Sequence, residues 1–161
     1  MRQAEKLKST RLLNSLVGKR DSAPGHHVNL LHCFFSPPGS RSDAATGAAT
    51  NVGRRPPLPA SPVAASTDVL GRYGGEEFVV LMPNTARDQA LISAERLRLT
   101  LASTMIAPLT EPITVSIGAV EFVPGESGDA LLRRMDEALY EAKRSGRNRV
   151  LAARTDQRTS R

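Results

Sequence analysis

Two glycines stand directly before two acidic residues in the segment GRYGGEEF, residues 71–78. Because glycine has no Cβ atom, the pair Gly74 and Gly75 would let a ligand come close to the backbone. The carboxylates of Glu76 and Glu77 suit a hard cation such as Mg²⁺, which can bridge to phosphate oxygens. The order therefore favours a site for a metal and a nucleotide phosphate. A type I′ turn with solvent-exposed acids is the simpler alternative.

The residues around these four predict the elements that must hold them. Apolar residues over 68–73 and 77–82 flank the glycines and predict a β-hairpin with a glycine turn. Pro83, Asn84 and Thr85 would end the second strand and supply an N-cap oxygen. The remaining elements follow in order: a helix from Ala86 to about Ser103, a strand over 113–122, a helix over 129–146 and a strand over 148–153.

The second helix has the clearer amphipathic pattern, and Gly146 stands where a C′ glycine would end it. We also expect Tyr140 to pack in the core. The order strand, strand, helix, strand, helix, strand predicts an α/β fold, an α+β sandwich of helices on a sheet. The predicted apolar face consists of Leu131, Leu132, Met135, Ala138, Leu139 and Ala142.

Composition sets limits on the class of protein. The 161 residues suit one domain, and the formal net charge of +6 fits an anionic partner or a basic surface. Aromatic residues make up only 4% and tryptophan is absent, which argues against base stacking on an aromatic platform. The basic residues are scattered and form no recognised motif, so we expect no nucleic-acid partner.

The cysteine content and the chain start bear on location. The single cysteine, Cys33, allows no internal disulfide and favours a reducing compartment. No apolar run reaches membrane-spanning length, and the start MRQAEKLKST lacks the apolar core of a signal peptide. We therefore expect no membrane segment and a cytoplasmic location.

Three ordered motifs resemble those of GGDEF domains, the diguanylate cyclase family. They are GRYGGEEF with the apolar strand after it, ITVSIGAVEF at 113–122, and DEALYEAKRSGRNRV at 136–150. The last is similar to the C-terminal signature of the family almost residue for residue. The resemblance runs from about Asp68 to Val150.

The resemblance implies a fold and a reaction. The fold would be nucleotidyl-cyclase-like, with helices covering a central, mostly antiparallel sheet. Members of the family condense two GTP into cyclic di-GMP and release pyrophosphate, using Mg²⁺ or Mn²⁺. Each GTP sits on one protomer, so a homodimer must bring two half-sites together for a 3′-hydroxyl to attack an α-phosphate.

The resemblance also assigns roles to residues. Gly74-Gly75 would contact the nucleotide, Glu76 would bind metal and help deprotonate the hydroxyl, and Glu77 would support the metal. Lys143 and Arg147 would grip the terminal phosphates, lying four residues apart near one face as the helix ends. The alternative for these two is a solvated basic helix end that complements the helix dipole.

The N-terminal half departs from the family pattern. The segment TRLLNSLVGKR, 10–20, resembles an eroded copy of the opening motif of the family. If NLLHCFF, 29–35, stands where the family has its metal-binding strand, Leu31 and Cys33 occupy the two aspartate positions. The only aspartates before residue 67 are Asp21 and Asp43, and neither ends an apolar strand. The first metal-binding aspartate is therefore missing, and we expect impaired turnover.

Two explanations of this half stay open: a degenerate domain, or a shifted reading frame over about 21–66. Residues 36–66 are rich in proline, alanine, glycine and arginine and show no periodicity, which predicts irregular structure. We expect a degenerate or disordered portion over 1–66, the GGDEF C-terminal half over 67–153 and a tail over 154–161. The alternative function is a catalytically inactive GGDEF domain that acts as a nucleotide sensor or a dimerisation module.

Two further groups carry weaker signals. Asp68 matches the aspartate of the product-inhibition motif of the family, but Ala65 stands at the arginine position, so the inhibitory site would be a remnant. The histidines at 26, 27 and 32 and the neighbouring cysteine fit no zinc spacing, and we expect them to be ordinary loop residues.

Overall fold

The computed structural model describes residues 27–37 and 68–154. None of the helices in these ranges is long and apolar enough to cross a membrane. The described elements are, in chain order, β1 (Val28–Ser36), β2 (Val69–Arg72), β3 (Glu77–Pro83), α2 (Arg87–Ser103), β4 (Thr114–Glu121), α3 (Gly128–Arg144) and β5 (Val150–Ala152).

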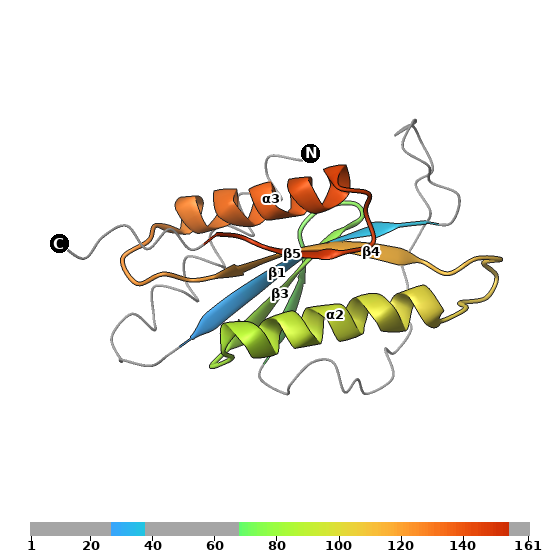
Figure 1. Ribbon diagram of the computed structural model, residues 1–161, viewed down its shortest axis with the longest axis horizontal. Coiled ribbons are helices and arrows are strands. Elements are labelled where there is room, and N and C mark those ends of the chain that lie inside the picture. Colours follow the sequence, from blue (N-terminus) through green and yellow to red (C-terminus); the bar gives the residue numbers. More distant parts are fainter. Residues whose placement is uncertain (1–26, 38–67, 155–161) are drawn as a thin grey trace.

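The five strands form one mixed sheet in the order β2-β3-β1-β4-β5. β1 pairs antiparallel with β3 and β4, β2 pairs antiparallel with β3, and β4 and β5 are parallel. Helix α3 lies on one face and α2 on the other, which gives three layers (Figure 1). The predicted sandwich with a mostly antiparallel sheet is therefore confirmed. Most of the segment predicted to be irregular, from residue 38 to 66, lies outside the described residues.

Strand β1 is the central strand, although it comes from the half of the sequence that departs from the family. Its first six residues are buried, because sheet neighbours flank it on both sides and helices cover both faces. The histidine at 32 was expected to be a loop residue, and that expectation is wrong, since it is buried in this strand. The two faces alternate along β1: Leu30 packs in the α3 layer, and Leu31 and Cys33 pack in the α2 layer.

Each face of the sheet has its own apolar cluster. The cluster under α3 brings together Val28, Leu30, Tyr73, Val79, Leu81, Val120, Leu131, Leu132 and Met135. The cluster under α2 brings together Leu31, Cys33, Met82, Ala90, Ala94, Val115, Ile117 and Ala119.

The predicted N-cap of the first helix is wrong. Helix α2 has Ala86 at its N-cap position, and no side chain caps it. The Thr85 hydroxyl instead donates to the Pro83 carbonyl at 3.1 Å, and the Thr85 carbonyl accepts from Asn29 Nδ2 at 2.7 Å. Those contacts tie the turn to β1, so the hydroxyl is not available to the helix.

Helix α3 follows its sequence pattern more closely. All six predicted apolar-face residues are buried, and Ser127 caps the start by accepting from the Ala130 amide at 3.3 Å. The helix ends at Arg144, two residues before the predicted end, and Gly146 has φ 115° as a C′ glycine does. Tyr140 was expected in the core, but it is 59% exposed.

Gly118 lets α3 approach β4 closely. A Cβ atom at this position would lie 2.4 Å from the Leu139 amide nitrogen and 2.8 Å from the Met135 carbonyl oxygen. Both neighbours are helix backbone and cannot rotate away as a side chain could. The separation of helix and sheet is therefore set by the absence of a side chain at 118.

A buried polar pair lies next to this contact, under α3. The Tyr73 ring packs edge-on against the His32 ring at 4.9 Å between centroids, and His32 Nδ1 lies 3.1 Å from an Asp136 carboxylate oxygen. Burial, and then the negative charges of Asp136 and Glu77, raise the pKa of Tyr73 to about 12. Tyr73 thereby joins the hairpin to β1 and α3.

Replacing Gly118 with alanine should destabilise the fold by about 1–3 kcal/mol or more, because α3 must move off the sheet. Urea unfolding followed by circular dichroism measures this. Gly75→Ala is the matched control, since a Cβ atom there meets no atom of the described residues within 4 Å. Equal stability of the two variants would contradict the close approach.

The phenol of Tyr73 should make stability fall at high pH. The unfolded tyrosine has a pKa of about 10, whereas the folded pKa is about 12. The contribution is therefore complete below pH 10 and is lost as the pH rises towards 12. Tyr73→Phe should flatten this part of the curve of unfolding free energy against pH, measured with urea between pH 9 and 12.

Tyr140→Phe removes an exposed phenol from α3 and is the control, with an unchanged slope expected. If Tyr73→Phe and Tyr140→Phe alter the slope equally, the burial of Tyr73 is not the cause.

Candidate functional site

The turn between β2 and β3 carries the two glycines and the first acid. The amides of Tyr73 and Gly74 both donate to the Glu77 carbonyl, at 2.8 and 3.1 Å. Among the described glycines only Gly125 and Gly146 have positive φ. A type I′ turn needs positive φ at both central residues, so the simpler alternative of a type I′ turn does not describe this hairpin.

Nothing in the described part of the fold explains the glycine at position 75. Its backbone has no left-handed conformation, and an added Cβ atom would meet no atom of residues 27–37 and 68–154 within 4 Å. At Gly74 an added Cβ atom would meet the Glu77 carboxylate at 3.2 Å, the end of a flexible side chain. The missing side chain at 75 thus leaves open space over exposed backbone, as a close-fitting ligand requires.

Arg72 braces this turn, a role that sequence reasoning missed. Its Nε donates to the Gly74 carbonyl at 3.1 Å, and its Nη2 donates to the Gly75 carbonyl at 3.0 Å. The only available sequence signal was an arginine two positions before a glycine pair, which cannot distinguish a brace from a surface charge.

The hairpin and the end of α3 meet at an ion pair. Lys143 Nζ lies 3.2 Å from Glu77 Oε1 and 3.7 Å from the centre of the Phe34 ring. The two charged side chains are 25% and 32% exposed. Such a pair is worth at most about 1 kcal/mol, so Lys143 can exchange this partner for another anion at small cost.

Glu76 and Glu77 are the carboxylates that would hold the predicted metal ion. Glu76 is exposed on the turn, and Glu77 is half-buried beside Lys143. Across residues 27–37 and 68–154 no group of three or more histidine, cysteine or acidic side chains could hold a metal ion. Mg²⁺ that keeps waters and shares substrate phosphates needs only one or two carboxylates. Glu76 and Glu77 fit such a shared site and not a self-contained one.

The register assumed for the metal-binding strand puts Leu31 and Cys33 at the two aspartate positions. Leu31 and Cys33 face α2, on the side of the sheet opposite Lys143. The residue of β1 that contacts Lys143 is Phe34. Neither face of β1 presents a carboxylate, because Val28–Ser36 contains no acidic residue.

Cys33 is chemically quiet in this position. Burial raises the pKa of its thiol to about 12, so the thiolate that would bind metal or attack a substrate does not form near neutral pH. His32, its neighbour, points to the opposite face of β1, as alternation along a strand requires. The described residues therefore hold no histidine–cysteine metal cluster.

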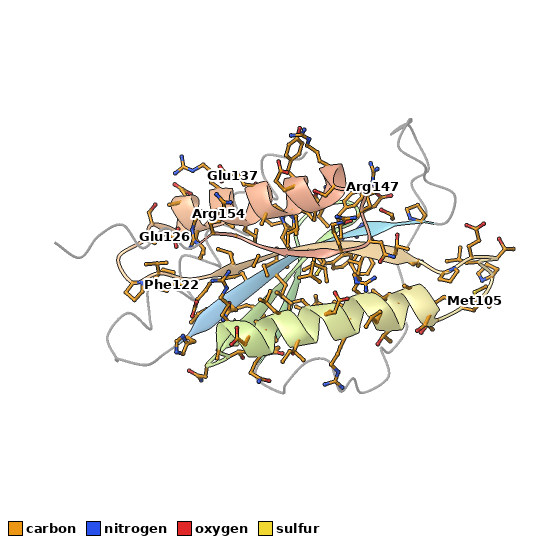
Figure 2. All side chains as sticks on the ribbon, in the orientation of Figure 1. Met105, Phe122, Glu126, Glu137, Arg147 and Arg154 are labelled. Carbon is orange, nitrogen blue, oxygen red and sulfur yellow. The ribbon has the colours of Figure 1, made fainter. Side chains whose placement is uncertain are left out.

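Arg147 lies beyond the helix and not on it. Because α3 ends at Arg144, the expectation that Lys143 and Arg147 share a helix face is wrong. Arg147 stands in the loop that leads to β5, at the same end of α3 as Lys143 (Figure 2). Its amide donates to the Ala142 carbonyl at 3.1 Å, and its carbonyl accepts from Arg149 Nε at 3.2 Å.

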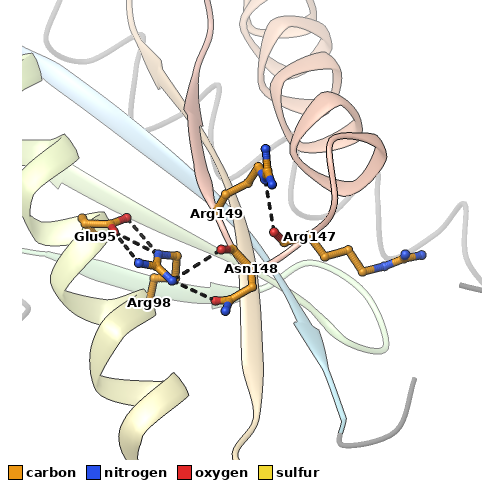
Figure 3. Close-up of polar contacts among 5 residues, drawn as sticks. All are labelled: Glu95, Arg98, Arg147, Asn148 and Arg149. Atoms are coloured by element: carbon orange, nitrogen blue, oxygen red, sulfur yellow. Dashed lines mark hydrogen bonds and ion pairs between the residues drawn. The ribbon is translucent and has the colours of Figure 1, made fainter. Parts of the chain in front are cut away.

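A charged pair on α2 reaches this loop. Arg98 forms a fork with Glu95, and hydrogen bonds from the guanidinium lower the pKa of the Glu95 carboxyl. Arg98 Nη1 also donates to Asn148 Oδ1 at 3.1 Å (Figure 3). This contact could not be predicted from a local motif, because 50 residues separate the partners.

Asp68 directly precedes β2, which is an edge strand of the described sheet. Lys143 lies on a different element, helix α3. Ala65, the residue at the arginine position of the inhibitory motif, lies outside the described residues. The structure thus brings Glu77 and Lys143 into contact, and it places Gly74, Gly75 and Glu76 on the adjoining turn.

Comparison with known proteins agrees with this architecture. The model of the family "Diguanylate cyclase, GGDEF domain" matches residues 60–149. Diguanylate cyclase DgcM of Escherichia coli (strain K12) is 51% identical over 86 residues, which cover 53% of this chain and 21% of that protein. Response regulator PleD of Caulobacter vibrioides (strain NA1000 / CB15N) is 45% identical over 92 residues, covering 52% and 20%. The matched part spans about a fifth of the length of these curated relatives.

Solved structures show the same fold. The crystal structure of the GGDEF domain of DgcB from Caulobacter crescentus, in complex with c-di-GMP, gives a TM-score of 0.68 at 26% identity over 93% of this chain and 91% of that chain. The active GGEEF domain of a diguanylate cyclase from Vibrio cholerae gives 0.64 at 19% identity over 95% and 97%. The family match covers more than half of the sequence, and solved GGDEF domains share the fold: this chain belongs to the GGDEF family.

Proposed function

We propose that this domain binds GTP between the glycine turn and the end of α3, and that paired copies condense two GTP into cyclic di-GMP. The observation that supports this most is the open space at Gly75, which no described part of the fold requires. The space adjoins two carboxylates and lies on the hairpin that contacts Lys143. Anionic and cationic groups around exposed backbone suit a metal-bound triphosphate.

The basic residues at the end of α3 would hold the phosphates. Lys143 would leave Glu77 and act as a point charge on a phosphate oxygen, and Arg147 can engage phosphate with two parallel hydrogen bonds. Because the ion pair with Glu77 is weak, little free energy is needed for Lys143 to change partners.

The acids would hold a divalent cation together with the substrate. Mg²⁺ or Mn²⁺ at Glu76 and Glu77 would neutralise phosphate charge and favour ionisation of the attacking 3′-hydroxyl. Glu76 is the exposed acid of the two, and it would accept the proton of that hydroxyl.

The reaction needs two bound GTP molecules, so we propose a homodimer in which each copy holds one GTP. A cytoplasmic location would supply GTP and would suit the free thiol of Cys33. Because β1 lies in the centre of the sheet, we propose one domain that includes β1 and ends at about residue 153, followed by a tail.

We further propose that turnover is slow. Strand β1 presents the Phe34 ring to Lys143, where an acid would add a third carboxylate to the site. An aromatic ring supplies no oxygen ligand and excludes water from the place where a cation would keep its hydration.

The phosphate contacts can be measured without turnover. Replacing both Lys143 and Arg147 with alanine should weaken GTP binding about a hundredfold or more, because each charge-assisted contact is worth about 1.5–3 kcal/mol. Isothermal calorimetry with GTP and Mg²⁺ gives both affinities. The matched control replaces the exposed Arg96 and Arg133, which removes the same charge elsewhere. Equal affinity of the wild type and the Lys143→Ala/Arg147→Ala variant would place the ligand elsewhere.

The missing acid can be tested by adding one. Phe34→Asp should raise Mg²⁺-dependent formation of cyclic di-GMP from GTP at least severalfold over a wild type with little product, followed by liquid chromatography. Phe34→Asn has a similar shape without the charge and should not raise it. Adding Glu76→Gln to Phe34→Asp should abolish the gain.

Fast product formation by the unmodified chain, abolished by Glu76→Gln, would show that two carboxylates are enough. If the wild type binds GTP and the Phe34→Asp variant still forms no cyclic di-GMP, a nucleotide sensor or a dimerisation module is favoured.

A further inference from the structure

The loop after α3 holds Arg147 in a backbone conformation that arginine rarely adopts. Three consecutive residues, Gly146, Arg147 and Asn148, have positive φ, at 115°, 56° and 43°. Glycine adopts such angles freely and asparagine tolerates them, whereas other L-residues are disfavoured there. A run of this kind persists only where the surroundings hold it.

The bonds inside the loop fix its two ends. The Arg147 amide returns to the Ala142 carbonyl of α3, at 3.1 Å. The Asn148 amide donates at 3.2 Å to the hydroxyl of Ser116, a fully buried residue of β4. Neither bond involves the side chain or the carbonyl group of Asn148.

Arg98 of α2 holds them. Its Nη1 donates to Asn148 Oδ1 at 3.1 Å and to the Asn148 carbonyl at 3.4 Å. Glu95 fixes the same guanidinium by accepting from Nε at 2.9 and 3.0 Å and from Nη2 at 2.5 Å. The Arg98 side chain is only 17% exposed, and its planar guanidinium is bonded to Glu95 on one side and to Asn148 on the other. Glu95 thereby fixes the orientation in which Arg98 binds Asn148.

We propose that Arg98 is a positioning residue for the phosphate contact of Arg147, and that it acts through Asn148. The inference rests on the proposed function, in which Arg147 binds a GTP phosphate. The Arg147 side chain leads away from Arg98 and Asn148 (Figure 3), so Arg98 would act through the loop and not on the ligand of Arg147 itself.

The physical effect is preorganisation. With Asn148 held, the backbone at 147 starts in one conformation, and the ligand does not have to order it on binding. Without Arg98, Asn148 can leave the left-handed region and Arg147 samples other directions. The expected loss is in affinity for the triphosphate, at a temperature where the chain remains folded.

A double-mutant cycle tests this on the full chain. Calorimetry with a non-hydrolysable GTP analogue and Mg²⁺ compares wild type, Arg98→Gln, Arg147→Gln and the double variant, after circular dichroism has shown each to be folded. Arg147→Gln should weaken binding about tenfold or more, and Arg98→Gln about three- to tenfold. In the Arg147→Gln background, Arg98→Gln should have no further effect, because the group that it positions is gone.

Two further variants separate positioning from stability and charge. Arg96→Gln removes a charge from the exposed face of the same helix and should leave affinity unchanged. Asn148→Gly keeps the left-handed backbone accessible but removes Oδ1, so it should weaken binding as Arg98→Gln does. This variant also serves if Arg98→Gln fails to fold.

The outcomes distinguish the positioning role of Arg98 from the phosphate contact of Arg147. If Arg147→Gln weakens binding while Arg98→Gln and Asn148→Gly do not, the positioning role is wrong and the proposed function stands. The role is also wrong if Arg98→Gln weakens binding equally in both backgrounds. If Arg147→Gln leaves affinity unchanged, the phosphate contact of the proposed function fails, and the positioning role fails with it.

Discussion

The backbone of α3 rests directly on β4 at Gly118, and the position of the candidate site follows from that contact. A side chain at 118 would overlap the helix backbone at Met135 and Leu139. With the helix held at this distance, its last turn reaches the hairpin and Lys143 meets Glu77. The same contact determines where the loop after α3 enters β5, which pairs with β4 from Ile117 onwards.

Local patterns were sufficient to predict most of the elements. The hairpin, both helices and the strand over 113–122 have apolar periodicity or glycine signals within a few residues, and all of them form. The apolar face of α3 was predicted completely because burial repeats with the helix period. The prediction for Tyr140 failed because adjacency in a motif says nothing about which side of the helix a residue occupies.

Long-range contacts account for the rest of what sequence reasoning missed. The side of β1 that faces Lys143 depends on how the strand is placed in the sheet: Leu31 and Cys33 face α2, whereas Phe34 contacts Lys143. The bond between Arg98 and Asn148 joins residues on separate elements, and no short motif signals it. Arg147 does not lie on the helix because α3 ends at Arg144, two residues before the predicted end. A difference of this size is usual for helix boundaries.

The positive φ angles at Arg147 and Asn148 also limit which sequences this loop can accept. Valine, isoleucine and threonine are strained in that region, whereas glycine, asparagine and aspartate tolerate it. A saturation library selected only for folding should therefore lose β-branched residues at both positions. Such a selection reports the constraint that the chain path places on residues 147 and 148, separately from any constraint that the proposed phosphate contact would add.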